Sequence, residues 1–382
     1  MKFIKLRKIN KKFLIPVFGG VVVLIYRIFI NKIPKYDIID KNPFLINIYI
    51  SLGMFFAFIP NLILKHRIKT TSFPDTRTES KLHSEIINNE KSISYQFLKL
   101  ILYSTIFDFL QILLSIFFSY ECIYNLWFFD ILFMSLFSYM ILKTKLYRHQ
   151  YFSIIIIIIF GFILNIIEYF KLDNNDNKLD FFKIFMKFLC EICLSIGIVI
   201  IKYNMDKTYC TPYEICCFQG LFGLILNIIV LVIINTLGVE ISHIKYPNNF
   251  YELFDNYDIY DFIICFIIII VYFVYNIVLL ITCDYFTPFH ILITSIIKEC
   301  YNYLQLDENT NLNILGFFIL VIIAFMFLVF IEIIEINVCN ISYNTKNNIE
   351  TRALIDSIDD IKSYIFNPND EALIELNTLL GD

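Results

Sequence analysis

The sequence predicts an all-α, polytopic membrane protein with about ten transmembrane helices arranged as two inverted five-helix repeats. The chain has 382 residues, 58% of them hydrophobic, and a mean hydropathy of +0.69. The hydrophobic residues gather into runs of about 18 to 25 residues, the length that crosses a bilayer as a helix. These runs are unbroken rather than alternating, which favours helices over a membrane barrel.

Ten apolar runs are the candidate spans. A short polar bridge joins the sixth run to the seventh, and within it Thr211 is placed to cap the next helix, with Pro212 in its first turn. The ninth run is the weakest candidate, because it is short and carries Lys298 and Glu299. In chain order the runs are 13–30, 44–64, 97–119, 124–142, 151–169, 182–201, 213–237, 259–282, 289–304 and 314–334.

The charges of the connecting segments predict the orientation. Placing alternate loops in the cytosol gives that side about 17 Lys and Arg and the other side about seven, as the positive-inside rule requires. We therefore expect both termini to be cytosolic, and we expect the polar segment 67–94 to be a linker. The chain divides into a basic amino end (1–12), a first five-helix half (13–170), a non-cytosolic loop (171–181), a second five-helix half (182–335) and an acidic cytosolic tail (336–382).

An internal repeat accompanies these ten runs. The fourth and fifth runs are joined by the polar turn 143–150 and followed by Gly161, and the ninth and tenth are joined by 306–313 and followed by Gly316. Two copies separated by five crossings are inverted relative to one another. Inverted halves of this kind are typical of carriers that alternate between two states around a midplane site.

Several blocks resemble a known family. Asn42-Pro-Phe-Leu45 with Gly53-Met-Phe55, Phe107-Asp108, the turn 146–150, Thr211-Pro212 with Gly220-Leu-Phe-Gly223, and 287–298 are similar in order and spacing to blocks of the drug/metabolite transporter superfamily (EamA-like). Within it they resemble the F-type members of the nucleotide-sugar-transporter-like solute carrier family 35. The likeness covers roughly residues 15–335.

This resemblance implies a carrier for a small polar or charged metabolite such as a nucleotide-sugar. Three positions depart from the family pattern. Gln219 stands where the family usually has an acidic residue, and Asp130 falls at or near an expected basic residue in the fourth helix. The basic residue of the ninth helix is displaced by about one place, to Lys298.

Ionisable and amide side chains inside the spans are the candidate site residues, because such groups are costly in lipid and usually face a cavity or a partner. Each has a plainer interpretation. Arg27 could snorkel to the headgroups, Glu191 could pair with Lys187 four residues earlier, and Asp130 could pair with Lys298. The candidate substrate-binding residues are Arg27, Asp108, Gln111, Asp130, Glu191, Gln219, Asn276, His290, Thr294 and Lys298.

Two of these groups share a helix face. Asp108 and Gln111 are three residues apart, so their side chains lie on one side of a helix, where hydrogen bonds between helices are the plainer alternative. His290, Thr294 and Lys298 recur every four residues and form a polar stripe, in which His290 could instead be a satisfied histidine at the membrane edge.

Absent motifs narrow the function. The sequence has no G-x-x-x-x-G-K-[ST], no H-E-x-x-H and no G-x-S-x-G, which argues against an ATP-driven pump, a metalloprotease and a serine hydrolase. A net charge of −4 offers no footprint for nucleic acid. We expect no enzyme activity, no metal and no cofactor.

The sequence thus predicts a secondary-active transporter working by alternating access. The alternatives are a non-transporting scaffold or sorting receptor with the same fold, and a lipid-modifying membrane enzyme. Glu375, Leu379 and Leu380 have the spacing of an acidic dileucine signal, which indicates an endosomal or lysosomal membrane, with the Golgi as rival, and a sorting adaptor as partner. The other expected partners are a small-molecule substrate, the lipid bilayer and a second copy of the chain in a homodimer.

Overall fold

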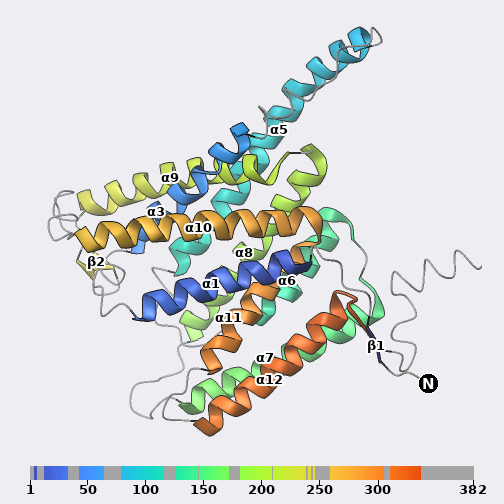
Figure 1. The fold of residues 1–382 in the computed structure, drawn as a ribbon, viewed down its shortest axis with the longest axis vertical. Helices are drawn as coiled ribbons and strands as arrows, with labels where there is room; N and C mark the ends of the chain where they lie inside the picture. The colour runs from blue at the N-terminus through green and yellow to red at the C-terminus, as the bar shows by residue number, and fades with distance from the viewer. Residues whose placement is uncertain are drawn as a thin grey trace, which may run out of the picture. The chain divides into compact units, whose positions relative to one another are not determined.

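The structure is a computed structural model that is mostly helical (Figure 1). It describes residues 4–6, 13–32, 43–63, 79–115, 126–144, 146–171, 181–208, 210–237, 240–241, 244–245, 259–304 and 310–336. Six of the described helices are long and apolar enough to cross a membrane. The prediction of a helical, multi-pass membrane protein is confirmed at this level.

The described helices are of two kinds, six long ones and several shorter ones that lie before or between them in the chain. The six are α5 (Glu79–Leu114), α7 (Arg148–Lys171), α8 (Phe181–Thr208), α9 (Pro212–Leu237), α10 (Ile259–Tyr285) and α12 (Thr310–Phe330). The shorter elements are α1 (Leu14–Lys32), α3 (Pro43–Phe55), η3 (Trp127–Phe129), α6 (Asp130–Phe137), the π-helical η4 (Ser138–Leu142), η6 (Pro288–Ile291) and α11 (Leu292–Leu304).

Each of the ten predicted spans therefore overlaps a helix, with local corrections. The second span is interrupted by a turn at Phe56 and Ala57 before it is helical again over 58–63. The expected linker 67–94 is wrong in its second part, because α5 already begins at Glu79. No Pro or Gly lies between Glu79 and Ser94, so a polar composition alone does not prevent a helix there.

The start of α9 follows the sequence prediction closely. Glu214 donates its backbone amide to Thr211 Oγ1 at 3.2 Å, and Thr211 donates its own amide to Glu214 Oε2 at 3.2 Å. This reciprocal arrangement is a capping box, which satisfies two amides that the helix cannot pair internally. Pro212 is the first residue of the helix, as predicted.

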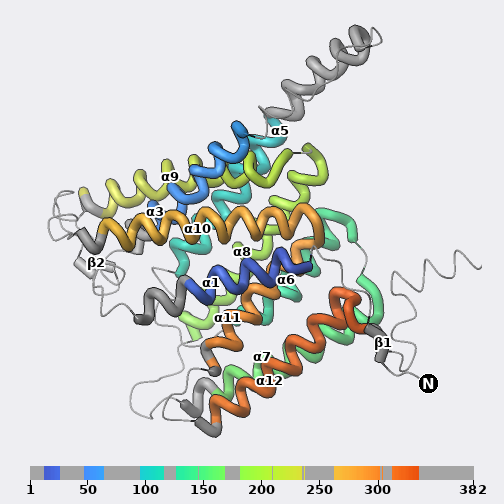
Figure 2. Tube along the Cα trace, viewed as in Figure 1, coloured from blue at the N-terminus to red at the C-terminus, as the bar shows by residue number. Residues whose placement is uncertain are grey.

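The chain forms two compact units, and the larger one comprises 10–145 and 156–324. In this unit α8 packs against α5 and α6, α9 packs against α3 and α5, and α10 packs against α1, α3 and α9, while α1 also packs against α11 (Figure 2). Large exposed hydrophobics occur on α8 only in its first turns, at Phe181, Phe182 and Phe185. Beyond them the middle of α8 is covered by other helices, and its polar residues Glu191 and Ser195 are buried.

Glycines set the closest helix approaches in this unit. A Cβ atom at Gly53 would lie 2.5 Å from the carbonyl oxygen of Ile269, which lets α3 and α10 meet through backbone atoms. A Cβ atom at Gly220 would collide with the backbone of Met54 and Phe55, so α3 and α9 also meet closely. Small residues at such crossings are typical of helices that associate within a membrane.

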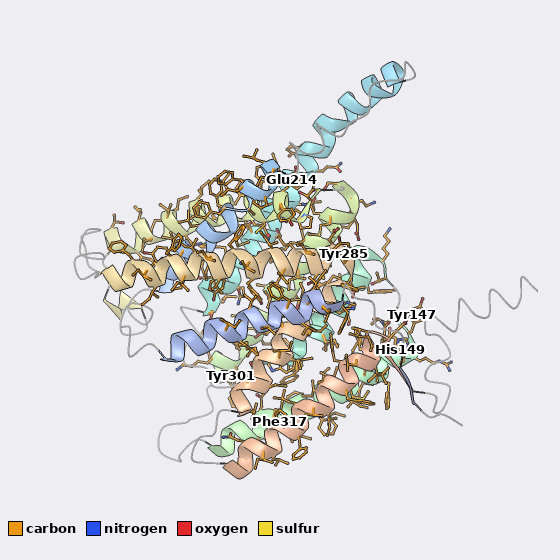
Figure 3. All side chains as sticks on the ribbon, in the orientation of Figure 1. Tyr147, His149, Glu214, Tyr285, Tyr301 and Phe317 are labelled. Atoms are coloured by element: carbon orange, nitrogen blue, oxygen red, sulfur yellow. The ribbon has the colours of Figure 1, made fainter. Side chains whose placement is uncertain are left out.

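The smaller unit contains 1–9, 146–155 and 325–382. Strand β1 (Ile4–Leu6) pairs antiparallel with β4 (Ile334–Ile336), so the predicted tenth span ends earlier, at Phe330. His149 Nε2 lies 3.3 Å from Glu332 Oε1, and Tyr147 stacks on His149 (Figure 3).

Candidate functional site

Asp108 lies on the inward face of α5. Leu102, Ile106 and Leu110 on the same helix are exposed, and they form the face that lipid would cover. At about 100° per residue, Asp108 lies roughly opposite the middle of that face. Its side chain is half-buried and is directed at α8 and α9.

The partners of the Asp108 carboxylate are neutral. Gln219 of α9 donates from Nε2 to Asp108 Oδ2 at 3.1 Å and to Ser104 Oγ at 3.4 Å. Ser104 in turn donates to the Ile101 carbonyl at 2.9 Å. Within the part of the chain that the structure describes, no lysine or arginine contacts Asp108. Gln219, predicted as a separate candidate, thus belongs to the Asp108 site.

A glycine of α8 makes room for the other carboxylate oxygen. A Cβ atom at Gly197 would lie 2.6 Å from Asp108 Oδ1, so no larger residue fits there without moving the carboxylate. Cys193, one turn earlier on α8, also lies near Asp108. Gly197 was not among the predicted site residues, although an isolated glycine inside an apolar helix indicates a close approach.

Asp130 forms a second polar site with different partners. Its side chain is only 2% exposed, and Ser195 donates from Oγ to Asp130 Oδ1 at 3.4 Å. Glu191 is hydrogen-bonded to Asp130, and Lys187 Nζ lies 3.2 Å from Glu191 Oε1. The pairing of Glu191 with Lys187 is confirmed, whereas pairing of Asp130 with Lys298 is wrong, because Lys187 is the lysine beside Asp130.

The two acidic sites lie on opposite faces of α8. Cys193 and Gly197 face Asp108, whereas Glu191 and Ser195 face Asp130. A shift of two residues along a helix turns the side chain by about 200°, which explains this separation. The sequence grouped both aspartates into one candidate set, and the structure divides that set into two sites.

The predicted stripe on α11 and η6 consists of residues with local partners. Thr294 is 3% exposed, donates to the Ile291 carbonyl at 2.7 Å and is hydrogen-bonded to Tyr275 of α10. His290 Nδ1 lies 3.0 Å from Thr287 Oγ1, and its ring stacks on Phe286. The arrangement of His290 fits the interpretation of a satisfied histidine at the end of a helix.

The remaining candidate residues do not join either acidic site in the described part of the chain. Lys298 Nζ lies 3.8 Å from Glu299 Oε1, and Asn276 donates to the Tyr272 carbonyl at 2.8 Å within its own helix. Gln111 is half-buried on α5. Arg27 belongs to α1, but its side chain is outside the described part, as are Glu375, Leu379 and Leu380 of the predicted sorting signal.

A further polar contact joins α3 and α9. Asn227 Nδ2 donates to the Gly223 carbonyl at 2.8 Å and to Ser51 Oγ at 3.4 Å, and Asn227 is 1% exposed. Neither Asn227 nor Ser51 was among the predicted site residues. Within the described residues, no group of three or more His, Cys, Asp or Glu side chains could hold a metal ion.

Comparison with known proteins adds no assignment, since no family model matches the chain and no curated protein matches it. The inference of function therefore depends on the helices and on the two acidic sites described above.

Proposed function

We propose that this chain is a secondary-active transporter of a small polar metabolite, with ten transmembrane helices arranged as two inverted repeats. The observation that carries the proposal is Asp108. It is an aspartate within a membrane-spanning helix that points into the bundle, is half-buried and has only neutral partners among the described residues. Ionisable residues inside membrane spans usually mark substrate or ion pathways.

The helix packing supports a two-repeat arrangement. The first repeat would comprise α1, α3, α5, the η3–α6–η4 segment and α7, and the second α8 to α12. In this scheme α1, α3, α5 and α6 correspond to α8, α9, α10 and α11. The α5–α8 contact then corresponds to the α10–α1 contact, α6–α8 to α11–α1, and α5–α9 to α10–α3, and all of these contacts occur. The fourth and ninth helices of this scheme both begin with a 3-10 turn, η3 and η6.

The paired strands support an even number of crossings. β1 precedes the first described helix and β4 follows the last described one, and the two strands are hydrogen-bonded along their length. A strand pair of this kind lies on one side of a bilayer, because an open sheet edge within lipid leaves backbone groups unsatisfied. An even number agrees with ten crossings, and the excess of Lys and Arg in the loops of that side supports a cytosolic location for both strands.

The proposed mechanism is alternating access. The two repeats would rock about α8, which lies between α5 and α6, and expose Asp108 to one side at a time. The energy would come from a gradient or from exchange of one solute for another. Inverted repeats with a site near the bilayer midplane are a common way to build such a carrier.

Reconstitution tests the proposal. Purified protein in liposomes is screened for uptake of a broad panel of metabolites, and the best substrate is then measured with Asp108→Asn and with Asp206→Asn as control. Asp206 is 52% exposed at the end of α8 and pairs with Lys202. We expect Asp108→Asn to lower initial uptake at least about tenfold at unchanged abundance, since it removes a charge that the cargo contacts, and Asp206→Asn to leave uptake unchanged.

Two outcomes contradict the proposal in different ways. Equal uptake by Asp108→Asn and the parent protein removes Asp108 from the site. A properly folded protein that takes up none of the compounds supports the scaffold or sorting-receptor alternative instead.

A further inference from the structure

The charges of the described helices differ in whether they have a partner of opposite sign. Lys187 lies 3.2 Å from Glu191, and Lys298 lies 3.8 Å from Glu299. Asp108 accepts a hydrogen bond from the neutral amide of Gln219, and no cationic side chain of the described residues contacts it. The Asp108 carboxylate therefore has no cationic partner among the described residues.

A carboxylate in this position requires neutralisation. Removing an isolated carboxylate from water is so unfavourable that it either gains a cation or takes up a proton. The side chain of Asp108 is only half-buried, so protein does not cover all of its surface, while Oδ1 packs against Gly197 of α8. The Gln219 amide fixes Oδ2 at 3.1 Å and so orients the carboxylate.

We propose that Asp108 binds the ammonium group of a cationic metabolite, so that the cargo of this carrier is a positively charged amine and not an anionic nucleotide derivative. This inference rests on the proposed transport function and specifies its substrate class. An anionic cargo at this position would instead place its negative charge against the Asp108 carboxylate, and like charges brought together at a desolvated site oppose binding.

The same geometry makes a proton the competitor of the amine. When no amine is bound, a proton on Asp108 neutralises the carboxylate, and each bound ammonium displaces one proton, so that charge is conserved. The groups that face Asp108 are Ser104 from α5, Cys193 from α8 and Gln219 from α9, and of these only the thiol can titrate. Amine binding should therefore weaken as pH falls, because protonation removes the negative charge that attracts the amine.

Equilibrium binding to the purified full-length protein in detergent tests this inference without requiring transport. The probes are radiolabelled tetraethylammonium and putrescine as cations, glucose as a neutral solute and UDP-glucose as an anion. We expect saturable binding of at least one cation, weaker at lower pH, with affinity reduced at least about tenfold in Asp108→Asn and retained in part in Asp108→Glu. Asp206→Asn should bind as the parent does.

Three results overturn the inference: no saturable binding of either cation, unchanged cation affinity in Asp108→Asn, or tighter binding of UDP-glucose than of both cations.

Failure of the transport proposal is distinguishable from failure of this inference. Cation binding that depends on Asp108, without uptake of any compound in liposomes, supports the site and contradicts the transporter. Uptake of anions that is independent of Asp108 supports the transporter and contradicts the site. A thermal unfolding curve for each variant identifies loss of folding.

Discussion

Two aspartates on opposite sides of α8 have very different surroundings. Asp130 is 2% exposed, accepts a hydrogen bond from Ser195 and shares a network with Glu191 and Lys187. Asp108 is half-buried and has the amide of Gln219 as its hydrogen-bond donor. The comparison teaches that a charged residue inside a membrane helix is not by itself a site. What separates a structural acid from an available one is whether the protein already supplies its partners.

The near-symmetry of the packing sharpens this contrast. Gly197 of α8 packs against Asp108 of α5, and Gly19 of α1 packs against Val278 of α10. In the proposed repeats α8 corresponds to α1 and α5 to α10, so each copy would have a glycine at this crossing. The group that the glycine meets is a carboxylate in one case and a valine in the other.

The largest expected effect is on the Asp130 side of α8. Lys187→Met leaves Glu191 and Asp130 buried without their base, and we expect a loss of about 3 kcal/mol in the free energy of unfolding, the lower end for a broken buried pair because Lys187 keeps some exposure. Unfolding in detergent titration, followed by the fluorescence of the single tryptophan, Trp127, measures it.

Lys202→Met is the matched control for this change. Lys202 pairs with the exposed Asp206 at 3.0 Å, and a surface pair contributes less than about 1 kcal/mol. Adding Glu191→Gln to Lys187→Met should recover most of the lost stability. Equal stability of Lys187→Met and the parent would show that the Asp130 side is not held by this network.

An intermediate effect is expected at the glycine on the Asp108 side. Gly197→Ala places a methyl carbon 2.6 Å from Asp108 Oδ1, which is too close, so the carboxylate must move. We expect a loss of about 1 to 2 kcal/mol in unfolding free energy from overpacking, together with a strong loss of uptake in liposomes. The control is Gly161→Ala, whose methyl group would meet the ring of Phe128 instead. That variant should lose stability but keep its uptake per folded molecule.

The smallest effect is expected for a single hydroxyl. Ser195→Ala removes the 3.4 Å hydrogen bond to Asp130, and we expect about 0.5 to 1 kcal/mol of lost unfolding free energy with unchanged uptake. Lower uptake by this variant at normal stability would mean that Asp130 also takes part in transport, and the distinction between the two faces of α8 would not hold.

The sequence predicted the helical segments well because each depends on a local property, a run of apolar residues long enough to cross lipid. The Lys187–Glu191 pair and the Thr211 cap were also predictable, since their partners lie within four residues of one another. Asp108 could be selected as a candidate because an acid in an apolar run is visible without a structure.

The partners across helices could not be predicted in this way. Nothing in the spacing of Asp130 specifies whether Lys187 or Lys298 lies beside it, because that choice depends on which helices pack together. The role of Gly197 has the same origin, since a glycine indicates a close approach but not the group that approaches. The early start of α5 at Glu79 was missed because polarity was taken as a sign of a linker.

The pairing of β1 with β4 has a consequence for how the protein is made. Ile4 leaves the ribosome before all the described helices, whereas its partner Ile336 emerges after all of them. At about 5 to 20 residues per second, the first strand waits for tens of seconds. Closure of this ribbon therefore follows synthesis of all the described helices, and a substitution that weakens the strand pairing would hinder completion of the fold more than insertion of those helices.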